Sequence, residues 1–282
     1  NLIVVPDESV KKEIYNFYSK VPMSVIEHGI DIKKENSDLK IEKNQKINIA
    51  FIGSIGIHKG SKILSQLINK RNLGKFKIHL FGHLDGVEQK NNRHYINHGK
   101  YIREDLKGLL HENKIHLVCL LSTVPETFSY TLSESIACGI PVLASDIGAL
   151  GNRIKKDSLG WLISPTATLE EIVDNLNTIF DNPVKYKKVI DNINSYKIKS
   201  TQEMALDYKK IYETYGKKKK MKIEKIRQKL KENTNYQIQV IDSTDSWVFS
   251  TLKWKIVSKI KLPKSTKKIL NKMNEVIRKE NV

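Results

Sequence analysis

From Ile47 onward, short apolar segments alternate with longer segments of helical periodicity, and this alternation constrains the fold more than any other feature of the sequence. Apolar runs bounded by polar turns are typical of buried strands, and the segments between them are long enough for helices. Because helices connect successive parallel strands through right-handed crossovers, the pattern predicts an α/β protein with a doubly wound, Rossmann-like parallel sheet. Strands are predicted at about residues 47–53, 76–81, 93–98, 115–121, 141–145 and 160–163, and helices at about 59–71, 103–113, 129–138, 146–156, 168–180, 184–195 and 200–215.

The residues before this series form a separate group. A strand, a helix at about 8–19 and a second strand ending at Val25–Gly29 are expected, followed by a polar, lysine-rich surface connector through Gln45. The run Leu2–Pro6 has the composition of a buried strand and begins without a lead-in, so we expect the chain to be cut from a longer protein. Its 282 residues exceed one typical domain but fall short of two Rossmann domains with a tail. The expected parts are residues 1–45, residues 46–216 and a basic, mainly helical tail of residues 217–282.

The formal net charge of +18 is concentrated in that tail. Residues 217–282 hold 19 Lys and Arg against 6 Asp and Glu, which leaves a net charge of only +5 on residues 1–216. A body so near neutrality does not favour nucleic acid as a partner. The tail interleaves aromatic and apolar residues with lysines between Trp247 and Lys261. This mixture suits an anionic membrane surface, and a solvated tail or a linker is the alternative.

Cysteine and histidine are not placed as metal ligands. Cys119 and Cys138 lie in apolar surroundings without a CxxC partner, so each is expected to be a buried, reduced thiol, as in a cytoplasmic protein. The 8 histidines show no metal-ligand spacing, and His28 is expected to pack between domains or to line a cleft. We therefore expect no metal site.

The segment Phe51–Gly60 runs from a predicted strand through a glycine-rich turn into a predicted helix. Glycines let backbone N–H groups approach an anion, the helix N-terminus adds partial positive charge, and Lys59 supplies a full charge. The turn is therefore a candidate phosphate cradle, and a plain strand-to-helix turn with an exposed lysine is the alternative. It matches neither the Walker A loop nor G-x-G-x-x-G, so ATP and nicotinamide motifs are not supported.

A pair of glutamates follows the predicted strand at 115–121. Glu126 lies in the loop after that strand, at the carboxyl edge of the sheet where ligands bind in open α/β folds. Glu134 lies one to two turns into the next predicted helix. Two such carboxylates can accept hydrogen bonds from hydroxyls at opposite ends of one ligand. Two solvated glutamates near a helix start are the alternative.

Six motifs follow one another along the chain: Gly53 with Lys59-Gly60, His98–Tyr101, Glu126-x7-Glu134, Ala137–Val142, Gly148-Ala149 and Gly160–Ile163. Their order resembles the donor domain of retaining GT-B glycosyltransferases of the family-4 type. Within that family the segments resemble a subset that assembles bacterial surface polysaccharides, and the resemblance covers about residues 1–216. Each motif is weak by itself, whereas six in the correct order are specific.

The resemblance implies a role for each candidate residue. Lys59 would bind the donor diphosphate, Glu126 the sugar hydroxyls and Glu134 the ribose hydroxyls, with Lys59 and Glu126 acting in catalysis. Tyr101 would border the base. Ser54 stands where the family usually has Arg, and Arg153 is considered as a replacement cation. The implied donor-binding set is Gly53, Ser54, Lys59, Tyr101, Glu126, Phe128, Thr131, Leu132 and Glu134, with Phe128–Leu132 contributing backbone amides.

The implied reaction is transfer of a sugar from a nucleotide diphosphate to a hydroxyl of a polysaccharide or glycolipid, with retention and with no cofactor or metal. Residues 1–45 would be the remnant of an N-terminal acceptor domain and its connector, so this chain is expected to be inactive by itself. Expected partners are the donor, a polysaccharide or lipid-linked acceptor and an anionic membrane surface, which places the protein in the cytoplasm or on the inner face of the membrane. The alternatives are a non-catalytic nucleotide-sugar-binding or scaffold module and a basic nucleic-acid or membrane adaptor.

Overall fold

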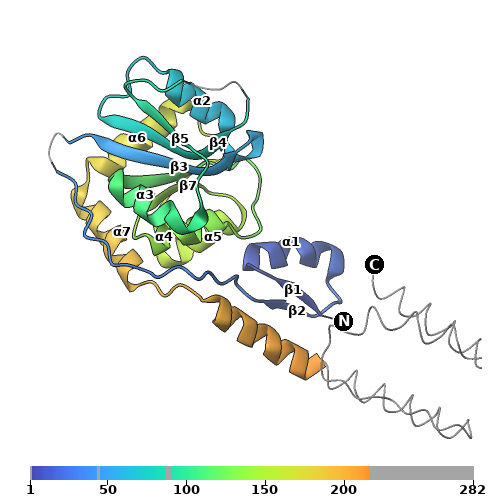
Figure 1. Cartoon of the computed structure of the whole chain (residues 1–282). Coiled ribbons are helices and arrows are strands. Elements are labelled where there is room, and N and C mark those ends of the chain that lie inside the picture. Colours follow the sequence, from blue (N-terminus) through green and yellow to red (C-terminus); the bar gives the residue numbers. More distant parts are fainter. Residues whose placement is uncertain (1, 43–44, 87–89, 216–282) are drawn as a thin grey trace, which may run out of the picture. The chain divides into compact units, whose positions relative to one another are not determined.

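A computed structural model describes residues 2–42, 45–86 and 90–215 (Figure 1). The chain divides into two compact units, Asn1–Lys218 and Lys219–Val282. The second unit, and with it the predicted helical tail, lies outside the described residues.

Six parallel strands form the main sheet of the described part of the chain, in the order β5-β4-β3-β6-β7-β8. The order reverses between β3 and β6, which are neighbours, so a topological switch point lies between them. The predicted doubly wound, Rossmann-like fold is therefore confirmed, and the six predicted strands are all present. Their bounds are β3 (Ile47–Ile55), β4 (Phe76–Leu84), β5 (Tyr95–Gly99), β6 (Ile115–Leu120), β7 (Val142–Ser145) and β8 (Gly160–Ile163).

Helices cover both faces of this sheet (Figure 1). Alternate residues of a strand point to opposite faces, so Phe51 joins one apolar core and Ile52 the other. The first core includes side chains of α2 (Ser61–Asn69) and α6 (Leu169–Phe180), and the second includes those of α3 (Leu106–Glu112), α4 (Tyr130–Ala137) and α5 (Gly148–Asp157). The helix α7 (Pro183–Ser195) contributes to both. Both cysteines are buried in these cores, as expected.

Local capping signals account for several helix starts. Thr168 and Glu171 form a capping box at α6, with each side chain bonded to the backbone N–H of the other residue. The Asn182 side chain caps α7, and Pro183 occupies its first turn. These two helices therefore begin within one residue of their predicted starts.

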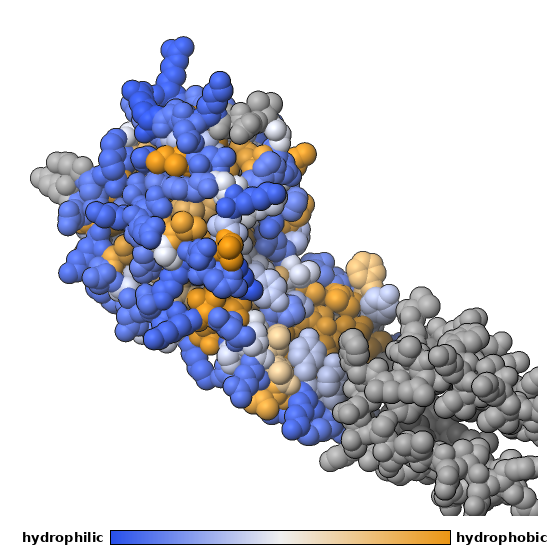
Figure 2. Space-filling view, viewed as in Figure 1, coloured by the Kyte–Doolittle hydropathy of each residue, from blue (hydrophilic) through white to orange (hydrophobic). Residues whose placement is uncertain are grey.

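The N-terminal residues form a second, two-stranded parallel sheet of β1 (Ile3–Val5) and β2 (Met23–Val25), with α1 (Glu8–Tyr18) between them. Leu2–Pro6 contains the predicted strand, but the prediction that this strand is buried is wrong, because only Val5 of the run is buried. No residue within α1 is buried either. Figure 2 shows apolar side chains gathered over this β1-α1-β2 unit.

The connector after β2 has no regular helix or strand in its described residues, yet it is held against the main domain. The N–H of Ile30 donates to the carbonyl of Lys199 at 2.9 Å. Ser37 and Asn194 exchange two hydrogen bonds at 2.8 and 2.9 Å. A Cβ on Gly29 would lie 2.1 Å from the carbonyl oxygen of Ser200, so only glycine fits at this approach. The connector is thus a surface segment fixed alongside the chain that follows α7.

Candidate functional site

The turn after β3 and the loop after β6 meet at the carboxyl edge of the sheet. The N–H of Thr123 donates to the carbonyl of His58 at 2.9 Å. Gly60 has a φ of +81°, and a Cβ there would lie 2.5 Å from the carbonyl oxygen of Leu121. Close contact between the two segments therefore requires glycine at position 60. The structure thus brings the phosphate turn against the start of the loop that holds Glu126, at the predicted edge of the sheet.

The candidate phosphate turn starts later than predicted. β3 continues to Ile55, two residues past the predicted strand end at 53, so Ser54 and Ile55 lie in the strand together with Gly53. Gly53 pairs with Gly82 of β4, where a Cβ on Gly82 would lie 2.1 Å from the Gly53 carbonyl oxygen. Close strand pairing, and not a turn, accounts for this glycine pair. The exposed side chain of Ser54 supplies no positive charge.

The turn itself is formed by Gly56, the 3-10 helix η1 (Ile57–Lys59) and Gly60. Among the described residues no side chain caps the N-terminus of α2, which begins at Ser61. Lys59 is partly exposed and forms no ion pair within the described part of the chain. A helix N-terminus without a side-chain cap and a lysine without an ion pair together attract an anion.

Glu126 is fixed in the loop that follows β6. Its side chain accepts a hydrogen bond from the Ser122 hydroxyl. Its backbone carbonyl accepts from the N–H of Ala149 at 3.1 Å, which attaches the loop to the start of α5. The half-buried carboxylate keeps lone pairs available for hydroxyl donors.

The start of α4 follows this loop. Ser129 precedes α4 with a φ of +71°, and its side chain makes no capping hydrogen bond. Phe128 and Leu132 are buried, whereas Thr131 is half-buried. The side chains of Phe128 and Leu132 belong to the protein interior, so only their backbone groups can face a ligand. The first N–H groups of α4 are therefore available to an anion.

Glu134 lies on α4 as a buried carboxylate with 6% exposure. The Nε of Arg103 lies 2.6 Å from its Oε1. Tyr101 is nearby and half-buried, and burial together with the charge of Glu134 raises its pKa to about 12. The Arg103 guanidinium also lies over the ring of Tyr130 at 5.7 Å. Tyr101, Arg103 and Glu134 thus form one cluster between α3 and α4.

Sequence reasoning missed Arg103. It lies in the 3-10 helix η2 (Arg103–Asp105) at the start of α3, where the helix dipole disfavours a cation. An arginine at the start of a helix is favourable only if a carboxylate lies close to it. The position of Arg103 before the predicted helix at 103–113 could therefore have indicated an acidic partner.

The contacts of Arg153 do not support it as a replacement for the missing cation at position 54. Its side chain is buried and bonded to the carbonyls of Phe128 and Ser129 at 2.9 and 3.1 Å. It also forms an ion pair with Glu27 at 3.3 Å. The guanidinium is thus engaged with groups of the protein interior.

His28 packs against the same loop. Its ring stacks on Tyr130 with a centroid distance of 5.5 Å and meets Phe128 edge-on at 4.9 Å. Burial and the charge of Arg153 lower the pKa of His28. Of the two roles expected for His28, packing or lining a cleft, these ring contacts support packing.

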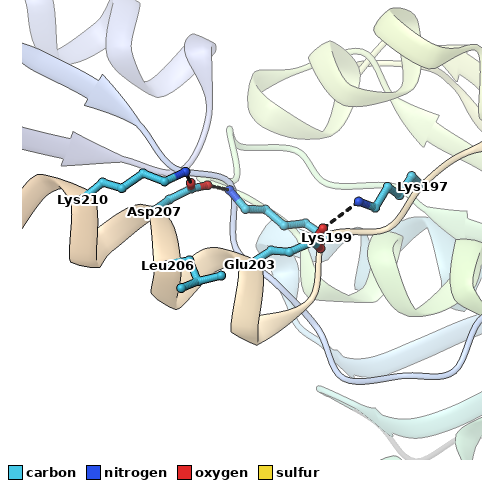
Figure 3. A pocket seen from close by; sticks show the side chains of 6 residues that line it. All are labelled: Lys197, Lys199, Glu203, Leu206, Asp207 and Lys210. Atoms are coloured by element: carbon cyan, nitrogen blue, oxygen red, sulfur yellow. Dashed lines mark hydrogen bonds and ion pairs between the residues drawn. The ribbon is translucent and has the colours of Figure 1, made fainter.

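A lysine-rich groove lies beside the helix of residues 201–215 (Figure 3). Two carboxylates pair with its three lysines: Lys197 with Glu203 at 2.7 Å, and Lys199 and Lys210 both with Asp207, at 2.7 and 3.1 Å. The groove therefore offers little net charge to an anion, and the carboxyl edge of the sheet remains the better candidate.

Residues 2–42, 45–86 and 90–215 contain neither a cluster of metal-ligating side chains nor a membrane-spanning helix. No group of three or more His, Cys, Asp or Glu side chains there could hold a metal ion. No helix within the same residues has the length and apolar content needed to cross a membrane.

Fold and site together define an α/β protein with a candidate ligand site at the carboxyl edge of a parallel sheet. The family model described as "Glycosyl transferases group 1" matches residues 31–196, which is more than half of the chain. The chain belongs to this family. A curated relative, an uncharacterized 41.2 kDa protein in the cps region of Klebsiella pneumoniae, is 26% identical over 209 residues, which cover 73% of this chain and 56% of the relative. The chain thus spans little more than half the length of that relative.

Solved glycosyltransferase structures share the fold. Anabaena Alr3699/HepE in complex with UDP matches with a TM-score of 0.59 and 18% identity, over 76% of this chain and 64% of that chain. Sucrose-phosphate synthase from Thermosynechococcus elongatus matches with a TM-score of 0.58 and 14% identity, over 76% and 58%. The lipopolysaccharide outer core galactosyltransferase WaaB matches with a TM-score of 0.53 and 18% identity, over 75% and 61%. The described sheet is thus the Rossmann-like half of a GT-B fold.

Proposed function

We propose that this chain binds a nucleotide-diphosphate sugar at the carboxyl edge of its main sheet and belongs to an enzyme that transfers the sugar, with retention, to a hydroxyl of a surface polysaccharide or glycolipid. The observation that supports this most is the contact between the turn holding Lys59 and the loop holding Glu126, with uncapped helix starts on both sides. The cps-region relative and the galactosyltransferase among the fold neighbours support a polysaccharide acceptor.

The proposed roles divide among three side chains. Lys59 and the N–H groups at the starts of α2 and α4 would stabilise the charge that develops on the leaving diphosphate, an effect worth about 3–4 kcal/mol per well-placed donor. Glu126 would hold the sugar hydroxyls and Glu134 the ribose hydroxyls. UDP is the first nucleotide to test, because HepE is described as a complex with UDP.

We further propose that β1, α1 and β2 belong to a second, N-terminal α/β domain that binds the acceptor. Parallel sheets normally have more strands and both faces covered, whereas this sheet has two strands. Tyr15, Phe17 and Tyr18 of α1 are 56–80% exposed, which leaves a large apolar surface for another part of the protein to cover. The chain as given should therefore show no appreciable sugar transfer, and turnover comparable to that of a two-domain relative would contradict this proposal.

The proposal for residues 217–282 concerns a segment outside the described residues. Its net charge of +13 and interleaved aromatic residues support attachment to an anionic membrane surface. Co-sedimentation with phosphatidylserine vesicles should pellet the intact chain but not a 1–216 truncation, and binding should weaken as salt increases. Equal pelleting of the two proteins would contradict membrane attachment.

Thermal unfolding of the intact chain with a panel of UDP, GDP, ADP and CMP tests donor binding. A ligand present at about 100 times its Kd adds about 2.7 kcal/mol to the free energy of unfolding, so one nucleotide should raise Tm clearly above the others. No shift with any nucleotide would contradict the proposed site. Donor hydrolysis, measured separately, distinguishes an enzyme from a non-catalytic nucleotide-sugar-binding module.

A further inference from the structure

Arg153 is an almost fully buried arginine that no catalytic or binding role explains. It lies on α5 with 8% exposure, although arginine is seldom buried without a partner. One guanidinium nitrogen, Nη1, donates to the carbonyl oxygens of Phe128 and Ser129 at 2.9 and 3.1 Å. The side chain thus holds the backbone that leads into α4.

The other side of the guanidinium joins two further segments. Nη2 donates to the Ser133 hydroxyl at 2.8 Å and to Glu27 at 3.3 Å. The guanidinium carbon lies 4.0 Å from the centroid of the Phe128 ring, within cation–π range. One side chain therefore joins the segment after β2, the loop before α4 and the first turns of α4. A buried charge with this many partners is costly to lose, because its removal leaves the partners unpaired.

The backbone that Arg153 holds is one that needs support. Ser129 has φ +71° and ψ +91°, a conformation that residues other than glycine rarely adopt. Such conformations persist where the surroundings over-determine them, and they are concentrated at binding sites. With the carbonyls of Phe128 and Ser129 bonded to Arg153, the chain enters α4 without a side-chain cap, so its first N–H groups are left for a ligand.

We propose that Arg153 is a positioning residue of the donor site: it fixes the Phe128–Ser129 backbone so that the N–H groups at the start of α4 meet the diphosphate of the donor. The inference rests on the proposed function and adds a residue that acts through the loop without touching the donor. The base and ribose are bound elsewhere, at the Tyr101 and Glu134 cluster. Loss of Arg153 should therefore weaken phosphate contacts and spare nucleoside contacts.

Calorimetric titration of the intact chain with UDP and with uridine tests this. Arg153→Ala should lower UDP affinity by at least about tenfold, because small misplacement of binding groups is costly, and should change uridine affinity less than about twofold. Arg153→Lys keeps the charge but cannot reproduce the branched hydrogen bonds, so an intermediate loss is expected. Asn152→Ala is the matched control. It also removes an α5 contact with the N-terminal segment, two hydrogen bonds to Asp7 at 3.1 Å, and both affinities should stay at the wild-type value.

The outcomes separate this inference from the proposed function. Wild-type protein that binds neither ligand overturns the proposed function and the inference with it. Wild-type protein that binds UDP, with an unchanged ratio of UDP to uridine affinity in Arg153→Ala, overturns the inference alone. If circular dichroism shows that Arg153→Ala is unfolded, Arg153→Lys decides: a wild-type ratio in that variant overturns the inference, and a lowered ratio supports it.

Discussion

The Nε of Arg103 lies 2.6 Å from Oε1 of Glu134, and this ion pair joins the start of α3 to the middle of α4. Glu134 is buried and Arg103 is half exposed, so the arginine satisfies a carboxylate that would otherwise lie unpaired in the protein. The second carboxylate oxygen of Glu134 keeps its capacity to accept from a ribose hydroxyl. A ribose bound at this position would therefore meet a carboxylate that is already paired with Arg103.

Glu134→Ala should weaken binding of UDP and of uridine to a similar extent, by about 1–3 kcal/mol, because the proposed contact is with the ribose that both ligands share. Calorimetry measures both affinities. Glu112→Ala, an exposed glutamate on α3, is the control and should leave both unchanged. Unchanged affinity of Glu134→Ala for every nucleotide tested would contradict the site assignment.

Lys59→Ala should weaken UDP binding by about 1–3 kcal/mol and leave uridine binding unaltered, since the lysine is proposed to contact phosphate only. The wild-type affinity for UDP should also fall with added salt, and more steeply than that of the variant. Lys62→Ala removes an exposed lysine three residues away on α2 and should behave as wild type. Equal losses for UDP and uridine would exclude a specific phosphate contact.

Gly60→Ala should lower the free energy of unfolding by about 1–3 kcal/mol, because a side chain at this positive φ is strained and its Cβ would lie 2.5 Å from the Leu121 carbonyl oxygen. UDP affinity should fall as well, since the phosphate turn must shift. Gly108→Ala on α3 meets open space and should instead raise stability by about 0.5–1 kcal/mol. Urea denaturation compares the two variants, and equal stability of both would count against the strain argument.

His79 should make stability depend on acid pH. Burial, with the charges of His98 and Lys77, lowers the pKa of His79 from 6.5 to about 4. Its neutral form is favoured in the folded protein, so this stabilisation is complete above pH 6.5 and is lost as pH falls towards 4. The loss amounts to about 3 kcal/mol for a difference of this size.

His79→Phe should flatten this dependence, since it removes the titrating ring. Nε2 of His79 has no hydrogen-bond partner among the described residues, so the ring loses only the hydrogen bond between its Nδ1 and Nε2 of His98 at 3.0 Å. Urea denaturation at pH 7 and pH 4.5 measures the effect. His83→Phe, at an exposed histidine, is the control and should keep the wild-type pH dependence. A variant with the full wild-type pH dependence would show that other groups are responsible.

The fold and the location of the site could be predicted because both depend on local and repeating patterns. The alternation of short apolar segments with helical segments predicted the six strands. A parallel sheet brings the carboxyl ends of its strands to one edge, so the turn at Lys59 and the loop at Glu126 were expected to meet there. The exact end of β3 was not predictable, because the Gly53 and Gly82 pairing that prolongs the strand involves residues far apart in the chain.

The side-chain partnerships depended on three-dimensional packing. Arg103 and Glu134 are 31 positions apart, and Arg153 and Glu27 are 126 positions apart, so no local periodicity relates them. Whether an arginine faces solvent, a phosphate or the interior depends on which helices pack side by side, because its long side chain reaches whichever carboxylate or carbonyl lies nearest. Sequence patterns therefore indicated where a ligand would bind, whereas the packing of α3, α4 and α5 determined which cation pairs with Glu134 and which one holds the loop before α4.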